Sequence, residues 1–293
     1  MEVRLLGTAA GGGVPQWNCA CAGCSGARQH PGRRRLHASL AVRAGGEGSA
    51  GGAGSGRWWL VNATPDIGEQ VEAFGLWPAS GRDSPIAGVV LTDAELDHTL
   101  GIARLREADR IEVTCAGTVR DAVSGWLGGL LEAYAELKWQ GFPVVDGDLV
   151  IESVPISGKR PRYARDEPGD VWVVALKITD RSTGGVLVYA PAAGDWPAAL
   201  QDAIDAADCV IVDGTFWDDD EPRRTGISER TATQMGHLPI AGGTSDRLAE
   251  LPGRRLYTHL NNTNPLVDPG APQHAALAEL GLEVAQDGMV IEL

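Results

Sequence analysis

The segment that decides the fold reads IAGVVL over residues 86–91 and continues directly as TDAELDH over residues 92–98. A run of apolar residues of this length predicts a buried strand. Three carboxylates and one imidazole follow it, and these are Asp93, Glu95, Asp97 and His98. Ligands bind beyond the carboxyl ends of such strands in layered α/β proteins. Because a divalent cation removes the repulsion between crowded carboxylates, the segment predicts a metal site at a strand exit.

The acidic residues also suit a solvated turn that caps a helix over residues 95–106, since carboxylates in a first turn favour the helix dipole. Spacing alone leaves both interpretations open. Other strand exits favour the metal site, because Asp213 follows the apolar run 210–212 and His259 ends the strand 255–259. His237 is a further candidate. Each of these residues alone would also suit a capping aspartate or a loop histidine, but together with the acidic segment they predict a mononuclear metal site.

Further elements follow from periodicity and from turn signals. Strands are predicted at residues 3–6, 38–43, 58–61, 149–154, 171–178, 186–190, 209–212 and 289–293. Helices are predicted at residues 117–137, 196–207, 226–235 and 271–281. Strands come in hairpin-like sets early and alternate with helices later, which predicts a layered α/β fold with a mixed sheet or two sheets. Residues 44–56, rich in glycine and serine, predict a flexible hairpin loop, and no boundary divides residues 1–293, so we expect a single domain.

A cysteine cluster lies near the N-terminus, in the loop WNCACAGC over residues 17–24. Three thiolates in a tight turn suit a tetrahedral zinc ion, for which Cys19, Cys21 and Cys24 are the predicted ligands. The alternatives are three free thiols, or a redox pair formed by Cys21 and Cys24. A fourth zinc ligand must come from elsewhere, and the chemically suitable residues are Asp268, His274, Asn262 and His237. The remaining cysteines, Cys115 and Cys209, lie in apolar contexts that are typical of core residues.

Composition narrows the classes of partner. The 293 residues carry a net charge of -14, which argues against binding to nucleic acid or to an anionic membrane surface. No apolar stretch is long enough to span a bilayer, and residues 1–7 lack the pattern of a signal peptide. We therefore expect a cytoplasmic protein whose substrate is not a polyanion. A second copy of the chain, in a homodimer, is a further candidate partner.

The order of these features resembles the metallo-β-lactamase superfamily, whose hallmark is H-x-H-x-D-H. Aligned on the end of that motif, this sequence has Asp93 and Glu95 in place of the two early histidines and retains Asp97 and His98. With this departure, the sequence resembles one branch of the superfamily, the coenzyme PQQ synthesis protein B family. The segments that carry the resemblance are GTAAGGGVPQWNCACAGC at 7–24, NATPDI at 62–67, DGTFW at 213–217, MGH at 235–237, HLNNTNP at 259–265 and DGM at 287–289.

This resemblance implies an αββα sandwich, with two mixed sheets flanked by helices, and a structural zinc on the three clustered cysteines. It also implies a role in the formation of pyrroloquinoline quinone (PQQ), which is built from a glutamate and a tyrosine of a small precursor peptide. The resemblance thus implies that the substrate is a small peptide or is derived from an amino acid. Two roles have been given to the family. One is a carrier that aids export of the product, and the other is an iron-dependent oxygenase that hydroxylates the tyrosine ring.

Without the two early histidines, a dinuclear hydrolase is not expected. Two histidines and one or two carboxylates with open positions suit iron(II) and dioxygen, and the predicted ligands are Asp93, Asp97, His98, Asp213 and His259. The predicted catalytic residues are Glu95 and His237, which would move protons, and Asn261. Trp17, Trp217 and Asp66 are predicted to contact the substrate. The alternatives are a mononuclear zinc hydrolase of a peptide-derived precursor and a non-enzymatic carrier.

Overall fold

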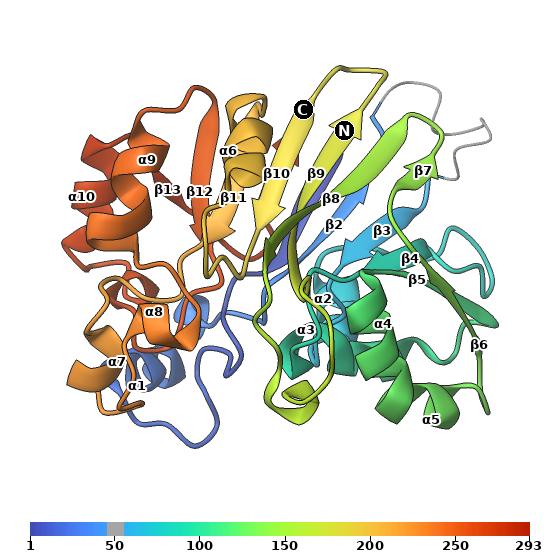
Figure 1. Ribbon diagram of the computed structural model, residues 1–293, viewed down its shortest axis with the longest axis horizontal. Helices are drawn as coiled ribbons and strands as arrows, with labels where there is room; N and C mark the ends of the chain where they lie inside the picture. The colour runs from blue at the N-terminus through green and yellow to red at the C-terminus, as the bar shows by residue number, and fades with distance from the viewer. Residues whose placement is uncertain (46–55) are drawn as a thin grey trace.

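Two seven-stranded β-sheets lie face to face in the computed structural model, which describes residues 1–45 and 56–293 (Figure 1). The first sheet has the order β14 (Val290–Glu292), β1 (Glu2–Gly7), β2 (Ser39–Arg43), β3 (Trp58–Val61), β4 (Ile86–Val90), β5 (Arg110–Thr114) and β6 (Glu136–Gln140). The second has the order β13 (Glu283–Val284), β12 (Arg254–Thr258), β11 (Cys209–Asp213), β10 (Val186–Ala190), β9 (Val173–Asp180), β8 (Leu149–Ser157) and β7 (Val144–Asp146). Each sheet is mixed, because antiparallel pairs give way to parallel pairs at β3–β4 and at β10–β11.

Alternating side chains build the layers. Leu40 and Val42 of β2 lie in the core between the sheets, whereas Ala41 faces the opposite side. In the same way Ile211 of β11 points between the sheets and Val212 points outward. Because successive side chains of a strand point to opposite faces, apolar residues cover both faces of each sheet. The outer face of each sheet is therefore an apolar surface on which helices pack.

Helices cover both outer faces (Figure 1). The first sheet packs against α2 (Ile67–Ala73), α4 (Gly117–Val123) and α5 (Gly129–Leu131). The second packs against α6 (Ala198–Asp205), α9 (Ser245–Ala249) and α10 (Gln273–Glu279). The helices α1 (Ala22–Gln29), α3 (Leu96–Thr99), α7 (Glu221–Arg224) and α8 (Ala232–Met235) lie in the connections at the edge where the site forms. The predicted αββα sandwich with two mixed sheets is confirmed.

Two predicted helices were wrong in part. The stretch 117–137 is helical only to Leu131, through a π-helical turn at Ser124–Gly128, and the chain then forms β6. Val119, Val123 and Leu131 of this stretch are buried, whereas Leu130 and Tyr134 are exposed. Of residues 226–235 only α8 is helical, because Gly226 takes a left-handed conformation and Thr231 opens a new helix through a capping box with Gln234. The elements that were not predicted are α1, α2, α7, α9, β5, β6, β7 and β13.

Most of the predicted hairpin loop at 44–56 lies outside the described residues. Among the residues that the structure describes, no helix is long and apolar enough to cross a membrane.

Candidate metal centre and cysteine cluster

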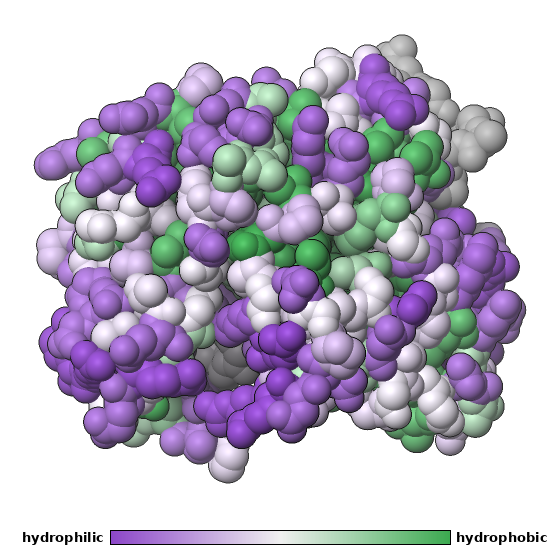
Figure 2. Space-filling model, in the orientation of Figure 1, coloured by the Kyte–Doolittle hydropathy of each residue, from purple (hydrophilic) through white to green (hydrophobic). Residues whose placement is uncertain are grey.

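Four strand exits meet around one cavity, and they belong to β3, β4, β11 and β12. Asn62, which follows β3, hydrogen-bonds through its side chain to Thr92, which follows β4, and so ties two exits together. The cavity has a volume of about 690 Å³ and is lined by residues of the 10–12 segment, α3, the 159–163 segment, α8 and the segments after β11 and β12. Figure 2 shows a hollow between α8 and the 159–163 segment, rimmed largely by hydrophilic side chains.

The His98 imidazole is held in one orientation. Its Nδ1 lies 2.7 Å from Oδ2 of Asp93, which also accepts from the Thr92 hydroxyl. Within residues 1–45 and 56–293, Nε2 of His98 is a buried nitrogen without a hydrogen-bond partner. Burial opposes protonation, but the charges of Asp93 and Asp97 outweigh it and raise the pKa of His98 to about 9. A buried nitrogen that is oriented from behind and has no partner in front is typical of a metal ligand.

His259 approaches the same point from β12. Its backbone has a left-handed φ of 59°, which few residues with a side chain adopt. Hydrogen bonds from Leu260 N to Thr8 O and from Asn261 N to Thr215 O hold the chain there. The Thr215 hydroxyl lies 2.8 Å from Nδ1 of His259, and Nε2 faces Asp97 Oδ2 at 3.5 Å. Backbone strain of this kind is found at functional sites, where neighbouring contacts maintain it.

Asp97 supplies the carboxylate between the two rings. Its Oδ2 lies 3.7 Å from Nε2 of His98, and it belongs with His98 and His259 to one group of side chains able to hold an ion. Burial alone would raise its pKa, but the charge of His98 and the hydrogen bond to His259 depress the pKa of Asp97 far below its usual range. Two imidazoles and one carboxylate with open positions form the facial triad of non-haem iron sites. The unpartnered nitrogen and the donor set therefore both fit a metal ion.

Asp213 and His237 form a second group of ligand-type atoms that shares His259. Asp213 Oδ2 lies 2.7 Å from Nδ1 of His237, and Oδ1 accepts from the backbone and the hydroxyl of Thr215. The other ring nitrogen of His237, Nε2, lies 3.1 Å from Lys159 Nζ. Burial and the Lys159 charge lower the pKa of His237 against the opposing charge of Asp213. The structure thus brings three predicted ligands, Asp97, His98 and His259, into one group. It places Asp213 in the neighbouring group that shares His259, and Asp93 behind His98.

The three clustered cysteines also converge. The amide nitrogen of Asn262 lies 3.1 Å from Cys19 Sγ and 3.3 Å from the sulfurs of Cys21 and Cys24. The other candidates for the fourth ligand are engaged elsewhere, because Asp268 pairs with Arg33, His274 faces the Leu266 carbonyl and His237 contacts Asp213. Three thiols able to hold an ion fit a structural zinc. Asn262 donates from Nδ2 to the sulfurs, so only its Oδ1, after rotation of the amide, would serve as a weak fourth ligand.

The chain is similar over its full length to known proteins of one family. A family model described as "Beta-lactamase superfamily domain" matches residues 57–259. Coenzyme PQQ synthesis protein B of Azoarcus sp. (strain BH72) is 40% identical, and that of Azotobacter vinelandii (strain DJ / ATCC BAA-1303) is 38% identical, with 100% of each chain covered. The chain belongs to the coenzyme PQQ synthesis protein B family.

Solved structures agree with this assignment. The crystal structure of Zn(2+)-bound PqqB from Methylobacterium extorquens superposes with a TM-score of 0.89 at 32% identity and covers both chains fully. A diphosphatase of the PhnP family, with a TM-score of 0.71 at 17% identity, shares the fold alone. The predicted family and superfamily are therefore confirmed.

Two further predicted residues line the cavity of this PQQ synthesis protein B family member, and they are Glu95 and Asn261. Burial, reinforced by the charge of Asp93, raises the pKa of Glu95. Asn261 donates from Nδ2 to the Thr263 hydroxyl at 2.6 Å, and that hydroxyl contacts Glu221 Oε1 at 2.7 Å. Glu221 is buried and also accepts from the backbone of Trp217. It therefore anchors the wall of the cavity that carries Asn261.

Glu221 is expected to make stability depend on pH. Burial raises its pKa to about 7, well above that of a carboxyl in the unfolded chain, so the folded state retains a proton that the unfolded state releases. The free energy of unfolding should therefore fall between about pH 4.5 and 7, by roughly 3 kcal/mol from this group. A Glu221→Gln variant, which mimics the protonated form, should lose that much less stability over the same interval.

Urea unfolding at several pH values measures this effect. The matched control is Glu229→Gln, which removes an exposed carboxylate from the loop before α8 and should leave the pH dependence of the wild type unchanged. Equal pH dependence in the wild type and in Glu221→Gln would contradict the assignment of the titration to Glu221.

Three residues predicted to contact the substrate lie away from the cavity. Trp17 is 88% exposed on the surface of the cysteine loop, and Trp217 packs against the core on the outer face of the second sheet. Asp66 is engaged by His37, which contacts it through both the backbone nitrogen and ring Nδ1. Sequence reasoning missed His37, Thr215 and Lys159. Thr215 lies within the DGTFW motif, and only its position beside Asp213 offered a signal.

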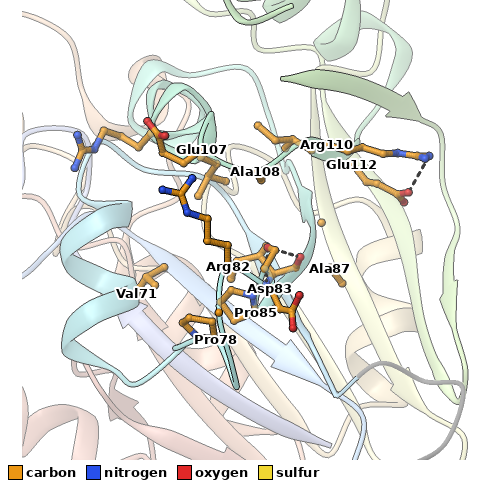
Figure 3. A pocket seen from close by; sticks show the side chains of 17 residues that line it. Val71, Pro78, Arg82, Asp83, Pro85, Ala87, Glu107, Ala108, Arg110 and Glu112 are labelled. Atoms are coloured by element: carbon orange, nitrogen blue, oxygen red, sulfur yellow. Dashed lines mark hydrogen bonds and ion pairs between the residues drawn. The ribbon is translucent and has the colours of Figure 1, made fainter. Parts of the chain in front are cut away.

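A second pocket, of about 450 Å³, lies at the opposite ends of β4 and β5. Figure 3 shows Arg82 pointing towards Glu107 across it, while Arg110 pairs with Glu112 at 3.2 Å. Its walls include arginines and acids but none of the ligand-type side chains described above. The chemistry therefore belongs to the cavity at the carboxyl ends of the strands.

Proposed function

We propose that this chain acts in PQQ biosynthesis as an iron-dependent oxygenase that hydroxylates the tyrosine ring of a peptide-derived precursor. The observation that supports it most is the arrangement of His98 Nε2, His259 Nε2 and Asp97 Oδ2, which face one another with a cavity in front. An iron(II) ion on these residues would supply the activation of dioxygen. One oxygen atom enters the ring and the other leaves as water, with two electrons from an external reductant such as ascorbate.

The protein residues supply orientation and proton handling. Asp93 and Thr215 fix the two imidazoles from behind, so that both present Nε2 to the cavity. Glu95 has a raised pKa and lines the cavity, which suits a carboxyl that holds or releases a proton near the substrate. Asn261, anchored through Thr263, offers an amide to the substrate. His237 is held at both ring nitrogens and serves mainly to orient its neighbours.

Ring hydroxylation is tested with protein purified without oxygen and loaded with iron(II). A glutamyl-tyrosine peptide and ascorbate are added, oxygen uptake is recorded, and the peptide mass is measured. We expect a gain of one oxygen atom per peptide with iron and none with zinc in its place. Peptide cleavage by the zinc form would support the hydrolase instead. Tight binding of PQQ without turnover of any peptide would support the carrier.

A further inference from the structure

Lys159 is unusual among the basic residues of this acidic chain. It is one of three lysines, and it lines the cavity rather than the outer surface. Its Nζ contacts Nε2 of His237 at 3.1 Å. In the part of the chain that the structure describes, no carboxylate lies within ion-pair distance of its Nζ, and its charge acts on the carboxyl of Glu95 without direct contact.

The surrounding backbone is built to hold this side chain. Gly236 has a left-handed φ of 84°, and a Cβ there would come within 2.5 Å of Lys159 Cδ. A side chain at position 236 would displace the lysine stem. Because Nδ1 of His237 is engaged by Asp213, the ring is fixed in turn, and Asp213, His237 and Lys159 form one row leading into the cavity.

Charges of both signs line the cavity. Glu95 and Asp97 line it at the start of α3, and Lys159, Arg162 and Arg230 line it from the 159–163 segment and the loop before α8. Arg160 is committed to the carbonyls of Glu167 and Gly169. In a chain with a net charge of -14, these basic side chains favour entry and alignment of an anion.

We propose that Lys159, positioned by His237 and Gly236, binds a carboxylate of the substrate and so turns its reacting ring towards Asp97, His98 and His259. A compact ammonium beside a fixed imidazole suits a single carboxylate oxygen. This inference rests on the proposed function for the identity of the ring, but recognition of the carboxylate requires no oxygenase chemistry.

The test compares two probes of the same shape, N-acetyl-glutamyl-tyrosine and its diamide N-acetyl-glutaminyl-tyrosinamide. Binding to the metal-loaded protein is measured by calorimetry for the wild type, Lys159→Met and Lys159→Arg. The wild type should prefer the dicarboxylate, and Lys159→Met should reduce that preference by about tenfold to a hundredfold. Lys159→Arg should restore part of it. Lys177→Met, which removes a lysine from β9 outside the cavity, should retain the full preference.

Two outcomes overturn the proposal. One is a carboxylate preference that survives in Lys159→Met, since any contribution from the metal is common to both proteins. The other is a wild type that shows no preference or binds neither probe. The proposed function stands or falls separately, on oxygen-dependent ring hydroxylation by the wild type. Melting temperatures of all variants show whether a loss of binding reflects a loss of fold.

Discussion

Replacing His98 by alanine is expected to remove the ion of the candidate metal centre and to leave the cysteine cluster loaded. His98 Nε2 is buried and faces Asp97 and His259, so no other side chain stands in the same place. Loss of one of three ligands removes metal-based stabilisation worth several kcal/mol, and ring hydroxylation should slow by roughly a thousandfold or more. Metal content by mass spectrometry, together with the peptide assay, measures both effects.

A milder substitution, at the residue that orients His98, separates the loss of a metal ligand from the loss of its orientation. Asp93→Asn keeps the size of the side chain but weakens its hold on His98 Nδ1, so metal affinity should fall by only about tenfold to a hundredfold. The matched control is His30→Ala, an exposed histidine outside the cavity, which should change neither metal content nor rate. If His98→Ala retained a full complement of metal at both centres, Asp97, His98 and His259 would not be the ligand set.

Local sequence patterns were sufficient for the strands that carry the site. Apolar runs before Thr92 and Asp213 predicted buried strands, and the structure has β4 and β11 there. Because β11 and β12 are parallel neighbours, their exits bring Asp213 and His259 to one edge. That these strand exits share one metal site was inferred from their residue types, but no local pattern showed that they belong to two different sheets that meet at one cavity.

The direction of each side chain was beyond sequence reasoning. Asp93 and Asp97 are both acids after the same strand, but α3 begins at Leu96, so Asp97 projects from a helix into the cavity while Asp93 stays behind His98. Contacts between residues far apart in the sequence could not be predicted either. Lys159 and His237 are 78 positions apart, and neither lies in a pattern that indicates the other.

Replacing Cys24 by serine is expected to destabilise the protein and to remove one zinc ion. Cys24 is buried, and its sulfur accepts from the backbone of Gln16 and from Asn262. Zinc sites in small peptides supply about 10–16 kcal/mol of folding free energy. This chain has a large core of its own, so we expect a smaller loss, about 5 kcal/mol, which corresponds to a fall in Tm of about 10 °C.

The matched control is Cys115→Ser, since Cys115 is also a buried thiol but lies in the core behind β5. It should lower Tm without changing the zinc content. Chelation of the wild type should reproduce the Cys24→Ser melting curve if the metal, rather than the packing of the thiol, is responsible.

The loss of zinc from the cysteine cluster should also change the cavity of the candidate metal centre. Asn262 contacts all three sulfurs, and its carbonyl packs so closely on Gly23 that a Cβ there would approach within 2.2 Å. The same loop carries Asn261 into the cavity and begins at His259, whose left-handed backbone needs support from its neighbours. Cys24→Ser should therefore weaken metal binding by Asp97, His98 and His259 at temperatures where the protein is still folded. Unchanged metal affinity of these residues in that variant would show that the cysteine cluster stabilises the fold alone.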